Sequence, residues 1–495
     1  MLTTRAGKAL AALLAGALLP LGFAPFGLFP LPLLALAVLA SLLYRAPPRN
    51  AFLYAWLFGV GQFGVGVSWI YISIYLYGDA SLAVSVAVML LFVAILAVYF
   101  ALAAAALARA GIHSAGWFLL AGFPAAWVFT EWVRSWLFTG FPWLNLGYSQ
   151  IDGPLAGYAA VSGVYGVGWL AALSAGLLAW MLYAGRSARL QGTAALLLVW
   201  SAGFALQHHD WTEVAGAPFT ATLVQGNISQ DLKWRSDQQQ STLKTYVTLT
   251  RQHLDSDLVV WPETAVPAYY DSVDMEFLEP LRRELQQHEV SLLTGVPVLE
   301  RSSREFFNAV ISLEQPGHFY FKEHLVPFGE YLPLRNWLAQ VLSFLPVPEG
   351  DFSAGPPRQL PLIAAGHPVG ASICYEIAFG EQLIRSVPSA AYLVNVSNDA
   401  WFGDSLAPHQ HLEMARMRAR ETGRYVLRAT NTGVSAIIDA DGGLLNRSEL
   451  FETQTVTAAV EPRSGITPYV RWGNWPVVTG LVAVLLVAGI RGRKL

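Results

Sequence analysis

The chain has 495 residues, of which 54% are hydrophobic and only 13% are charged, whereas an ordinary soluble domain is about 25% charged. Residues 1–209 contain only eight Lys or Arg and three Asp or Glu. This first part is too apolar for water, and the remainder has the composition of a globular domain. The net charge is −3 and no block of basic residues is present, which argues against a nucleic-acid-binding protein.

The apolar part contains stretches long enough for membrane helices, which need about 20 mostly apolar residues. Prolines divide the first apolar run into two segments. The last segment is short, but Trp472 and Trp475 at its start suit a membrane interface. We predict eight spans, at residues 9–24, 28–44, 51–76, 81–108, 116–138, 155–184, 191–207 and 475–490.

Positive charge in the connecting loops predicts the orientation of these spans. With eight spans, Asp79 and Asp152 fall on one side of the membrane. The flanking basic residues fall on the other side, namely Arg5, Lys8, Arg45, Arg49, Arg109, Arg186, Arg189, Arg491, Arg493 and Lys494. We therefore expect both termini in the cytoplasm and residues 208–474 outside it.

The predicted domains follow from this arrangement. Residues 1–209 hold the first seven transmembrane helices, residues 210–470 form an extracytoplasmic domain, and residues 471–495 hold the eighth helix and a cytoplasmic tail.

Strands and helices alternate after residue 218, which indicates a layered α/β domain. Two hairpins are expected, one at 308–327 with its turn at 315–318 and one within 425–445 with its turn at Asp441–Gly442. Apolar runs predict further strands at 219–228, 257–265, 291–298, 368–376 and 390–399, and helical patterns cover 238–254, 277–290 and 409–423.

Cys374 is the only cysteine of the chain. Thiols outside the cytoplasm usually form disulfides, and a single cysteine cannot do so within its own chain. It is therefore a candidate reactive group, although a free cysteine is more often a small buried hydrophobe. Glu263 and Lys322 also follow predicted strands. A carboxylate can take a thiol proton and an ammonium can stabilise an oxyanion, but such residues are common in α/β domains.

Three motifs add to this interpretation. WPET, K-x-x-L-V-P-F-G-E-Y and C-Y-E, in this order over residues 219–462, resemble the carbon–nitrogen hydrolase (nitrilase) superfamily. The resemblance implies an α-β-β-α sandwich with a Glu-Lys-Cys triad. Glu263 would be the general base, Lys322 the group that stabilises the oxyanion, and Cys374 the nucleophile.

The resemblance also implies residues that support this triad. Glu330, Tyr375 and Glu376 would help to build the site, and Trp234 would lie on a loop near it. Further candidates to line the pocket are Asn308, Asn395, Asn398 and Trp401.

With seven helices before the sandwich and one after it, the whole chain resembles membrane-bound acyltransferases of this superfamily. The implied reaction moves an acyl chain from a phospholipid, expected to be phosphatidylethanolamine, to the α-amino group of S-diacylglyceryl-cysteine on an apolipoprotein. A thioester on Cys374 would be the intermediate of this ping-pong reaction. The implied location is the bacterial inner membrane, with a periplasmic catalytic domain, and no cofactor, metal or nucleic acid is implied.

Three other interpretations stay open from the residues alone. The same triad with water as acceptor would make a membrane-tethered amidase or nitrilase. A transporter would use ionisable groups within the membrane, where the spans offer Glu131 and Arg134. A metal site at His409, His411 and Glu413 lacks the ligand spacing of helical zinc sites.

Overall fold

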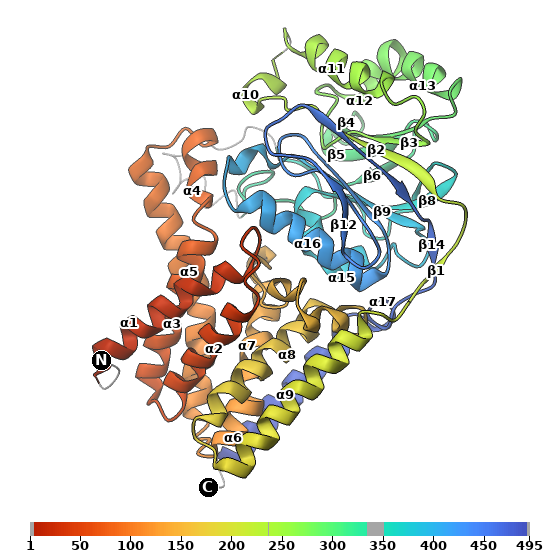
Figure 1. Ribbon diagram of the computed structural model, residues 1–495. Helices are drawn as coiled ribbons and strands as arrows, with labels where there is room; N and C mark the ends of the chain where they lie inside the picture. The colour runs from red at the N-terminus through yellow and green to blue at the C-terminus, as the bar shows by residue number, and fades with distance from the viewer. Residues whose placement is uncertain (1–3, 236, 334–350, 493–495) are drawn as a thin grey trace. The chain divides into compact units, whose positions relative to one another are not determined.

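The computed structural model describes residues 4–235, 237–333 and 351–492. Contacts between residues divide the chain into two units (Figure 1). One unit comprises Met1–Tyr75, Ser81–His209 and Arg471–Leu495, and the other comprises Leu76–Ala80 and Asp210–Val470.

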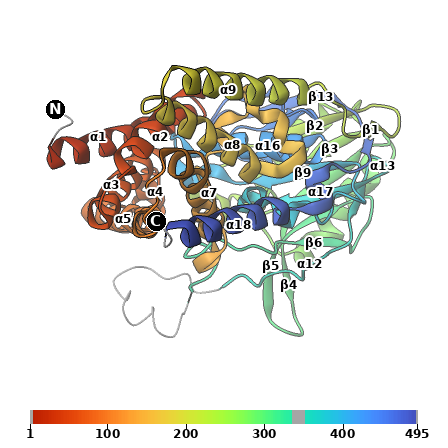
Figure 2. The same ribbon diagram turned by 90° about the horizontal axis from the view of Figure 1, so that it is seen from below.

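The first unit is helical, and α3 packs along both α1 and α5 (Figure 2). A Cβ on Gly61 of α3 would come within 2.3 Å of the Leu13 carbonyl oxygen, so only glycine permits this close approach. The helices are α1 (Arg5–Leu18), α2 (Pro30–Leu43), α3 (Pro48–Gly66), α4 (Ile70–Ile72), α5 (Leu82–Arg109), α6 (Ala115–Trp117), α7 (Phe123–Arg134), α8 (Ala159–Met181), α9 (Arg186–Leu206) and α18 (Trp475–Gly492). Short 3₁₀ or π turns cover Leu19–Gly22, Ser73–Tyr77, Phe118–Gly122, Leu137–Thr139, Tyr148–Gln150 and Pro154–Tyr158.

All eight predicted spans coincide with helical segments among the described residues. Four helices there are long and apolar enough to cross a membrane: Arg5–Gly22, Leu82–Arg109, Pro154–Met181 and Arg186–Leu206. A fifth would be the pair Pro48–Gly66 and Ile70–Tyr77, which is bent by 59°. Pro30–Leu43 and Trp475–Ile490 are shorter apolar helices. The number of eight spans stays a prediction.

Glu131 and Arg134, the ionisable pair of α7, hold the loop that follows this helix. The Oε1 atom of Glu131 accepts hydrogen bonds from Trp127 Nε1 and the Leu146 amide, both at 2.9 Å. Arg134 donates to the Trp143 carbonyl at 2.8 Å and to Asn145 Oδ1 at 2.6 Å. These contacts give both residues a structural role within the first unit.

The second unit contains two six-stranded sheets and a two-stranded ribbon of β1 and β14. The first sheet has the order β13-β2-β3-β4-β5-β6, and the second has the order β12-β11-β10-β9-β8-β7. The strands are β1 (Glu213–Val214), β2 (Phe219–Gln225), β3 (Leu258–Val260), β4 (Ser291–Glu300), β5 (Glu305–Ser312), β6 (Phe319–Phe321), β7 (Leu362–Ala364), β8 (His367–Ile373), β9 (Tyr392–Ser397), β10 (Val426–Thr430), β11 (Ala436–Ile438), β12 (Leu444–Arg447), β13 (Gln454–Val460) and β14 (Arg463–Ser464).

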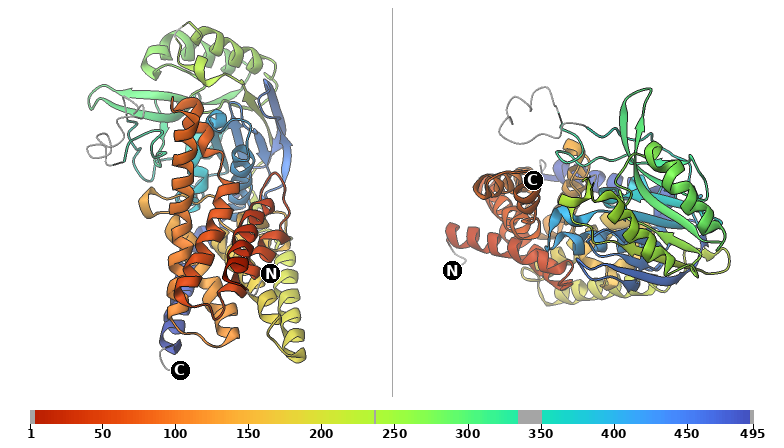
Figure 3. Two further views of the ribbon diagram at one scale, coloured as in Figure 1. Left: turned by 90° about the vertical axis from the view of Figure 1, so that its left-hand side faces the viewer. Right: turned by 90° about the horizontal axis from the view of Figure 1, so that it is seen from above.

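Helices cover the outer faces of the two sheets, as Figures 1 and 3 show. Apolar side chains of α11 and α13 pack on the first sheet, α16 contacts β10 and β11 of the second sheet, and the main core fills the space between the sheets. The helices are α10 (Gln230–Lys233), α11 (Gln239–Arg251), α12 (Tyr270–Val273), α13 (Glu279–Gln286), α15 (Gly380–Leu383), α16 (Ala407–Thr422) and α17 (Pro468–Trp472), and helical turns cover Asp274–Leu278, Cys374–Ala378 and Asp399–Phe402. The predicted α-β-β-α sandwich is confirmed.

Strand direction brings several strand ends to one edge of each sheet. β2, β3 and β4 are parallel to one another. β6 runs in the same direction, because β4, β5 and β6 alternate. In the second sheet β8, β9 and β10 are parallel. Side chains placed directly after such strands lie at the edges where α/β folds assemble their sites.

One predicted strand is shorter than expected. The pattern at 257–265 predicts a strand through Ala265, but β3 ends at Val260. Pro262 has no amide hydrogen to donate to a neighbouring strand, and Thr264 has a left-handed backbone with φ of 46°. The chain therefore turns at this point and presents Glu263 at the end of the strand.

Candidate active site

The three residues of the proposed triad each follow a strand. Glu263 comes three residues after β3, Lys322 directly follows β6, and Cys374 directly follows β8. All three are buried: Lys322 is 1% exposed, and Glu263 and Cys374 are 8% exposed. Buried charges need partners, so their contacts define what this site can do.

Lys322 lies between two carboxylates. Its Nζ atom is 2.8 Å from Glu330 Oε1 and 3.6 Å from Glu263 Oε1. Burial alone disfavours the ammonium form, but Glu330 and Glu263 outweigh it and raise the pKa of Lys322. This side chain therefore remains a cation at any physiological pH.

Glu263 is held at both of its carboxylate oxygens. Asn308 Nδ2 donates to Oε1 at 2.7 Å, and the amide of Asn398 donates to Oε2 at 2.8 Å. The turn that carries Glu263 also lies close against β4, where a Cβ on Gly295 would come within 2.7 Å of the Glu263 Cα. The carboxylate is thus fixed by hydrogen bonds and by packing at its backbone.

Cys374 sits at a sharp turn from β8 into a helical segment, and its φ is 52°. A left-handed backbone is strained for a residue with a side chain and is often found at functional sites. Burial, and then the charge of Glu263, raises the pKa of the Cys374 thiol to about 12, and Lys322 opposes this rise. Both proposed partners therefore act electrostatically on the thiol, which is protonated at neutral pH.

A buried network holds the backbone of this turn, and of its members the sequence analysis named only Asn395, as a pocket residue, and His411, as a possible metal ligand. The carbonyl oxygen of Cys374 lies 3.1 Å from His411 Nε2 and 3.4 Å from Asn395 Nδ2. His411 Nδ1 is 3.0 Å from Asp399 Oδ1, and Arg428 donates to Asp399 Oδ2 at 2.7 Å. Burial opposes ionisation of Asp399, but Arg428 and His411 outweigh it and lower the pKa of this carboxyl.

His411 is thus a contact of the cysteine backbone, whereas the sequence analysis considered it only as a metal ligand. The only signal in the sequence was its place on a predicted helix, which did not reveal the partner.

The Glu376 side chain forms hydrogen bonds with residues of both sheets. Its Oε2 atom accepts hydrogen bonds from the Ile373 amide at 2.7 Å and the Tyr320 hydroxyl at 3.0 Å. Its Oε1 atom accepts from the amides of Glu323 and His324 and from Gln382 Nε2, at 2.7, 3.1 and 2.7 Å. Burial raises its pKa. The carboxylate links the segment after Lys322 to the strand before Cys374.

The other predicted residues lie in different surroundings. Glu330 Oε2 accepts a hydrogen bond from the Val326 amide at 2.7 Å. The loop from Val326 to Glu330 therefore folds around the Glu330 carboxylate. Tyr375 is buried, with its ring edge-on to Phe379 at 5.0 Å. Trp234 is 54% exposed and Trp401 is 41% exposed, so neither ring belongs to the buried part of the site.

Lys233, which the sequence analysis missed, reaches the site instead of its neighbour Trp234. It is buried, and its Nζ donates to the Glu263 carbonyl oxygen at 3.0 Å. Burial lowers its pKa to about 8, although Glu263 and Cys374 act in the opposite direction. A lysine on a polar segment is usually exposed, which is why its sequence context did not reveal this contact.

The lowered pKa of Lys233 predicts a pH dependence of stability. Between about pH 8 and its ordinary pKa of 10.5, the unfolded chain holds a proton that the folded chain has released. The free energy of unfolding therefore rises with pH in this window. Relative to Lys233→Met, the wild type should gain stability between pH 8 and 10, measured by thermal unfolding in detergent. The control is Lys244→Met, because Lys244 lies on the exposed face of α11. If the unfolding free energies of the wild type and of Lys233→Met change equally with pH, the prediction is contradicted.

The sandwich is a carbon–nitrogen hydrolase fold, and the family model described as Carbon-nitrogen hydrolase matches residues 220–467. A second family model, described as Apolipoprotein N-acyltransferase N-terminal domain, matches residues 15–177. The chain belongs to the apolipoprotein N-acyltransferase family.

Named relatives cover nearly the whole chain. The apolipoprotein N-acyltransferase of Methylococcus capsulatus is 52% identical over 98% of this chain and 96% of its own length. Those of Pseudomonas aeruginosa and Nitrosomonas europaea are 41% and 42% identical, over 98% and 97% of this chain and 96% and 97% of their own lengths.

Proposed function

We propose that this protein transfers an acyl chain from a phospholipid to the α-amino group of S-diacylglyceryl-cysteine on an apolipoprotein, through a thioester on Cys374. Membership of the family supports the reaction class. The observation that supports the mechanism is the burial of Glu263, Lys322 and Cys374 after three strands, with Lys322 Nζ 3.6 Å from Glu263 Oε1 and with the charges of both residues acting on the pKa of Cys374.

The first half-reaction forms the acyl-enzyme. The Cys374 thiol is protonated at neutral pH because its pKa is about 12, so attack on an ester carbonyl needs a base. Glu263 accepts the thiol proton while sulfur bonds to the carbonyl carbon. Lys322 stabilises the oxyanion, since its two carboxylate neighbours keep it charged. The intermediate collapses, the ester C–O bond breaks, and the leaving lysophospholipid takes the proton from Glu263.

The second half-reaction transfers the acyl chain to nitrogen. An α-amino group has an ordinary pKa of about 8, so a useful fraction is neutral and nucleophilic at neutral pH. The amine attacks the thioester carbonyl, Glu263 accepts the ammonium proton, and the C–S bond breaks. The sulfur recovers a proton from Glu263, which leaves the enzyme in its starting state and the amine as an amide.

The remaining site residues position these groups. Asn308 and Asn398 orient the Glu263 carboxylate. Glu330 keeps Lys322 charged and in place, and Glu376 connects the segments that carry Lys322 and Cys374. Tyr375 packs beside the nucleophile, and Trp234 is proposed to contact substrate from its exposed position next to Lys233.

The apolar helices of the first unit would keep the reaction at the membrane. Each buried CH₂ of an acyl chain is worth about 0.8 kcal/mol, so acyl chains of both substrates are best kept in the membrane. We propose that the eight helical segments cross the bacterial inner membrane with both termini in the cytoplasm, as the positive residues in the loops indicate. The sandwich then lies in the periplasm.

The test is mass spectrometry of the intact protein after incubation with phosphatidylethanolamine and no acceptor. We expect the protein to gain the mass of one acyl group, and peptide mapping should place that group on Cys374. Addition of a diacylated lipopeptide should then release the acyl group from the protein as an amide of the lipopeptide. Absence of the acyl mass, together with rapid hydrolysis of simple amides, would instead identify a membrane-tethered amidase.

A further inference from the structure

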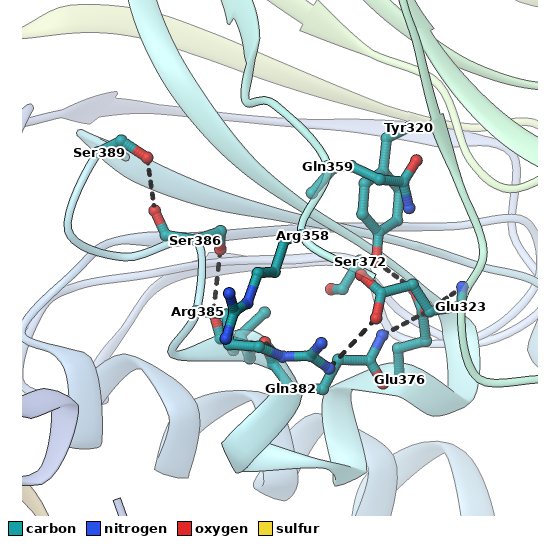
Figure 4. Close-up of a pocket in the computed structure, with 12 residues that line it drawn as sticks. Tyr320, Glu323, Arg358, Gln359, Ser372, Glu376, Gln382, Arg385, Ser386 and Ser389 are labelled. Carbon is teal, nitrogen blue, oxygen red and sulfur yellow. Dashed lines mark hydrogen bonds and ion pairs between the residues drawn. The ribbon is translucent and has the colours of Figure 1, made fainter. Parts of the chain in front are cut away.

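A cavity lies in the sandwich, and Cys374 is not among the residues that line it. Its volume is about 240 Å³, and Figure 4 shows that side chains from the loop before β7 and from the turn after α15 enter it. Arg358 and Arg385 supply two guanidinium groups, while Tyr320, Ser372 and Glu376 line its buried side. The proposed acyl transfer uses neither arginine.

Two carboxylates, those of Glu323 and Glu376, share this cavity with the two guanidinium groups. Arg385 forms an ion pair with Glu323 at 3.1 Å. The Glu376 carboxylate is already occupied by hydrogen bonds from Tyr320, from Gln382 and from backbone amides. Within the part of the chain that the structure describes, the Arg358 side chain has neither an ion pair nor a hydrogen bond. Arg385 and Glu376 therefore have partners, whereas the Arg358 side chain has no ion-pair partner among the described residues.

The backbone holds Arg358 in place. Its φ is 62°, and the next residue, Gln359, is clamped to β6 by two hydrogen bonds with the backbone of Phe321, at 2.7 and 2.6 Å. A donor on an anchored loop loses less conformational entropy when it binds a ligand. The loop is thus anchored at its backbone, while the Arg358 side chain itself is exposed and available to a ligand.

We propose that this cavity binds a phosphate group between Arg358 and Arg385. Guanidinium groups present several N–H donors in a planar fork that matches phosphate and carboxylate oxygens. Two guanidinium groups in one cavity suit the several oxygens of a phosphate better than the two of a carboxylate. The Ser389 hydroxyl also lines the cavity, where it donates a hydrogen bond to the Ser386 carbonyl oxygen at 3.1 Å. A phosphate monoester or the phosphodiester of a lipid head group has this chemistry.

The Glu323 carboxylate predicts the sign of one substitution. It pairs with Arg385 and repels an anion, so Glu323→Gln should free a guanidinium, remove a negative charge and tighten phosphate binding. Arg358→Ala and Arg385→Ala should each weaken it. Effects of opposite sign at adjacent positions are not expected from general damage to the fold.

The experiment is isothermal titration calorimetry of the full chain in a maltoside detergent at low salt, with inorganic phosphate or glycerophosphoethanolamine as the probe. We expect Arg358→Ala to raise the Kd at least tenfold and Glu323→Gln to lower it. The control is Arg301→Ala, because Arg301 forms an exposed ion pair with Asp271 at 3.2 Å outside the cavity, and its Kd should equal that of the wild type. Tighter binding of the diester identifies a lipid head group, and tighter binding of inorganic phosphate identifies a free monoester.

Two results would overturn the site: no saturable binding of either probe by the wild type, or an Arg358→Ala protein with unchanged affinity. Binding is read without acyl transfer, so the same titration on Cys374→Ser separates failure of this site from failure of the proposed function.

Discussion

Replacement of Cys374 by serine is expected to abolish acyl transfer and to leave the protein folded in the membrane. Serine is close in size to cysteine, so the buried turn after β8 can keep its hydrogen bonds to His411 and Asn395. A hydroxyl is a much weaker nucleophile than a thiol at this pH. Loss of a nucleophile in another enzyme lowers kcat by about 10⁶-fold, and turnover should fall here to the limit of detection.

The measurement is transfer of a labelled acyl chain to a diacylated lipopeptide, paired with intact mass spectrometry. Thermal unfolding of the variant in detergent provides the folding control, and its midpoint should stay close to that of the wild type. Normal N-acylation by a folded Cys374→Ser protein would remove the nucleophile assignment.

Glu263→Gln is expected to slow formation of the acyl-enzyme by about 10²- to 10⁴-fold, the usual contribution of a general base. The amide keeps the shape of the side chain but cannot accept the thiol proton. It also turns an N–H₂ group toward one of the two donors that now bind the carboxylate, Asn308 Nδ2 or the Asn398 amide. The rate is measured in a single turnover with excess enzyme, so that acylation is separated from release.

Glu421→Gln is the matched control for this experiment. Glu421 is a fully buried carboxylate of α16 that pairs with Arg418 at 3.0 Å. Its replacement should lower stability without changing the single-turnover rate. If Glu263→Gln acylates as fast as the wild type, the base must be sought elsewhere, and Lys233 would be the next group to test because it lies against Glu263.

Local pattern was enough to predict most of the sandwich. Apolar runs predicted β2, β4, β8 and β9, and helical spacing predicted α11 and α16, with ends within a few residues of those observed. These elements are set by neighbouring residues, since side chains alternate along a strand and recur on one face of a helix. Where a proline interrupts the pattern, at Pro262, the predicted strand was too long.

The membrane part is a different case. Hydropathy predicted the α-helices described in the first unit, though not the 3₁₀ turn Tyr148–Gln150, because a run of apolar residues is itself the property that the membrane selects. Four of the described helices satisfy length and hydropathy on their own, and a fifth does so when the bent pair Pro48–Gly66 and Ile70–Tyr77 is counted as one span. Which segments cross the bilayer stays a prediction from charge and length.

By itself the sequence determined the residue types available for chemistry: one thiol, an acid after β3 and a lysine after β6, each next to a strand. Only the tertiary structure decided what surrounds them. It placed His411 of α16 on the Cys374 carbonyl and the buried Lys233 on the Glu263 carbonyl, and it put Arg358 beside the cavity that Glu376 borders. Such contacts join residues far apart in the chain, and they depend on the order and direction of strands in two sheets. Local preferences for helix or strand do not encode that order, so the hydrogen bonds and charges around the thiol emerge only when the sheets pack.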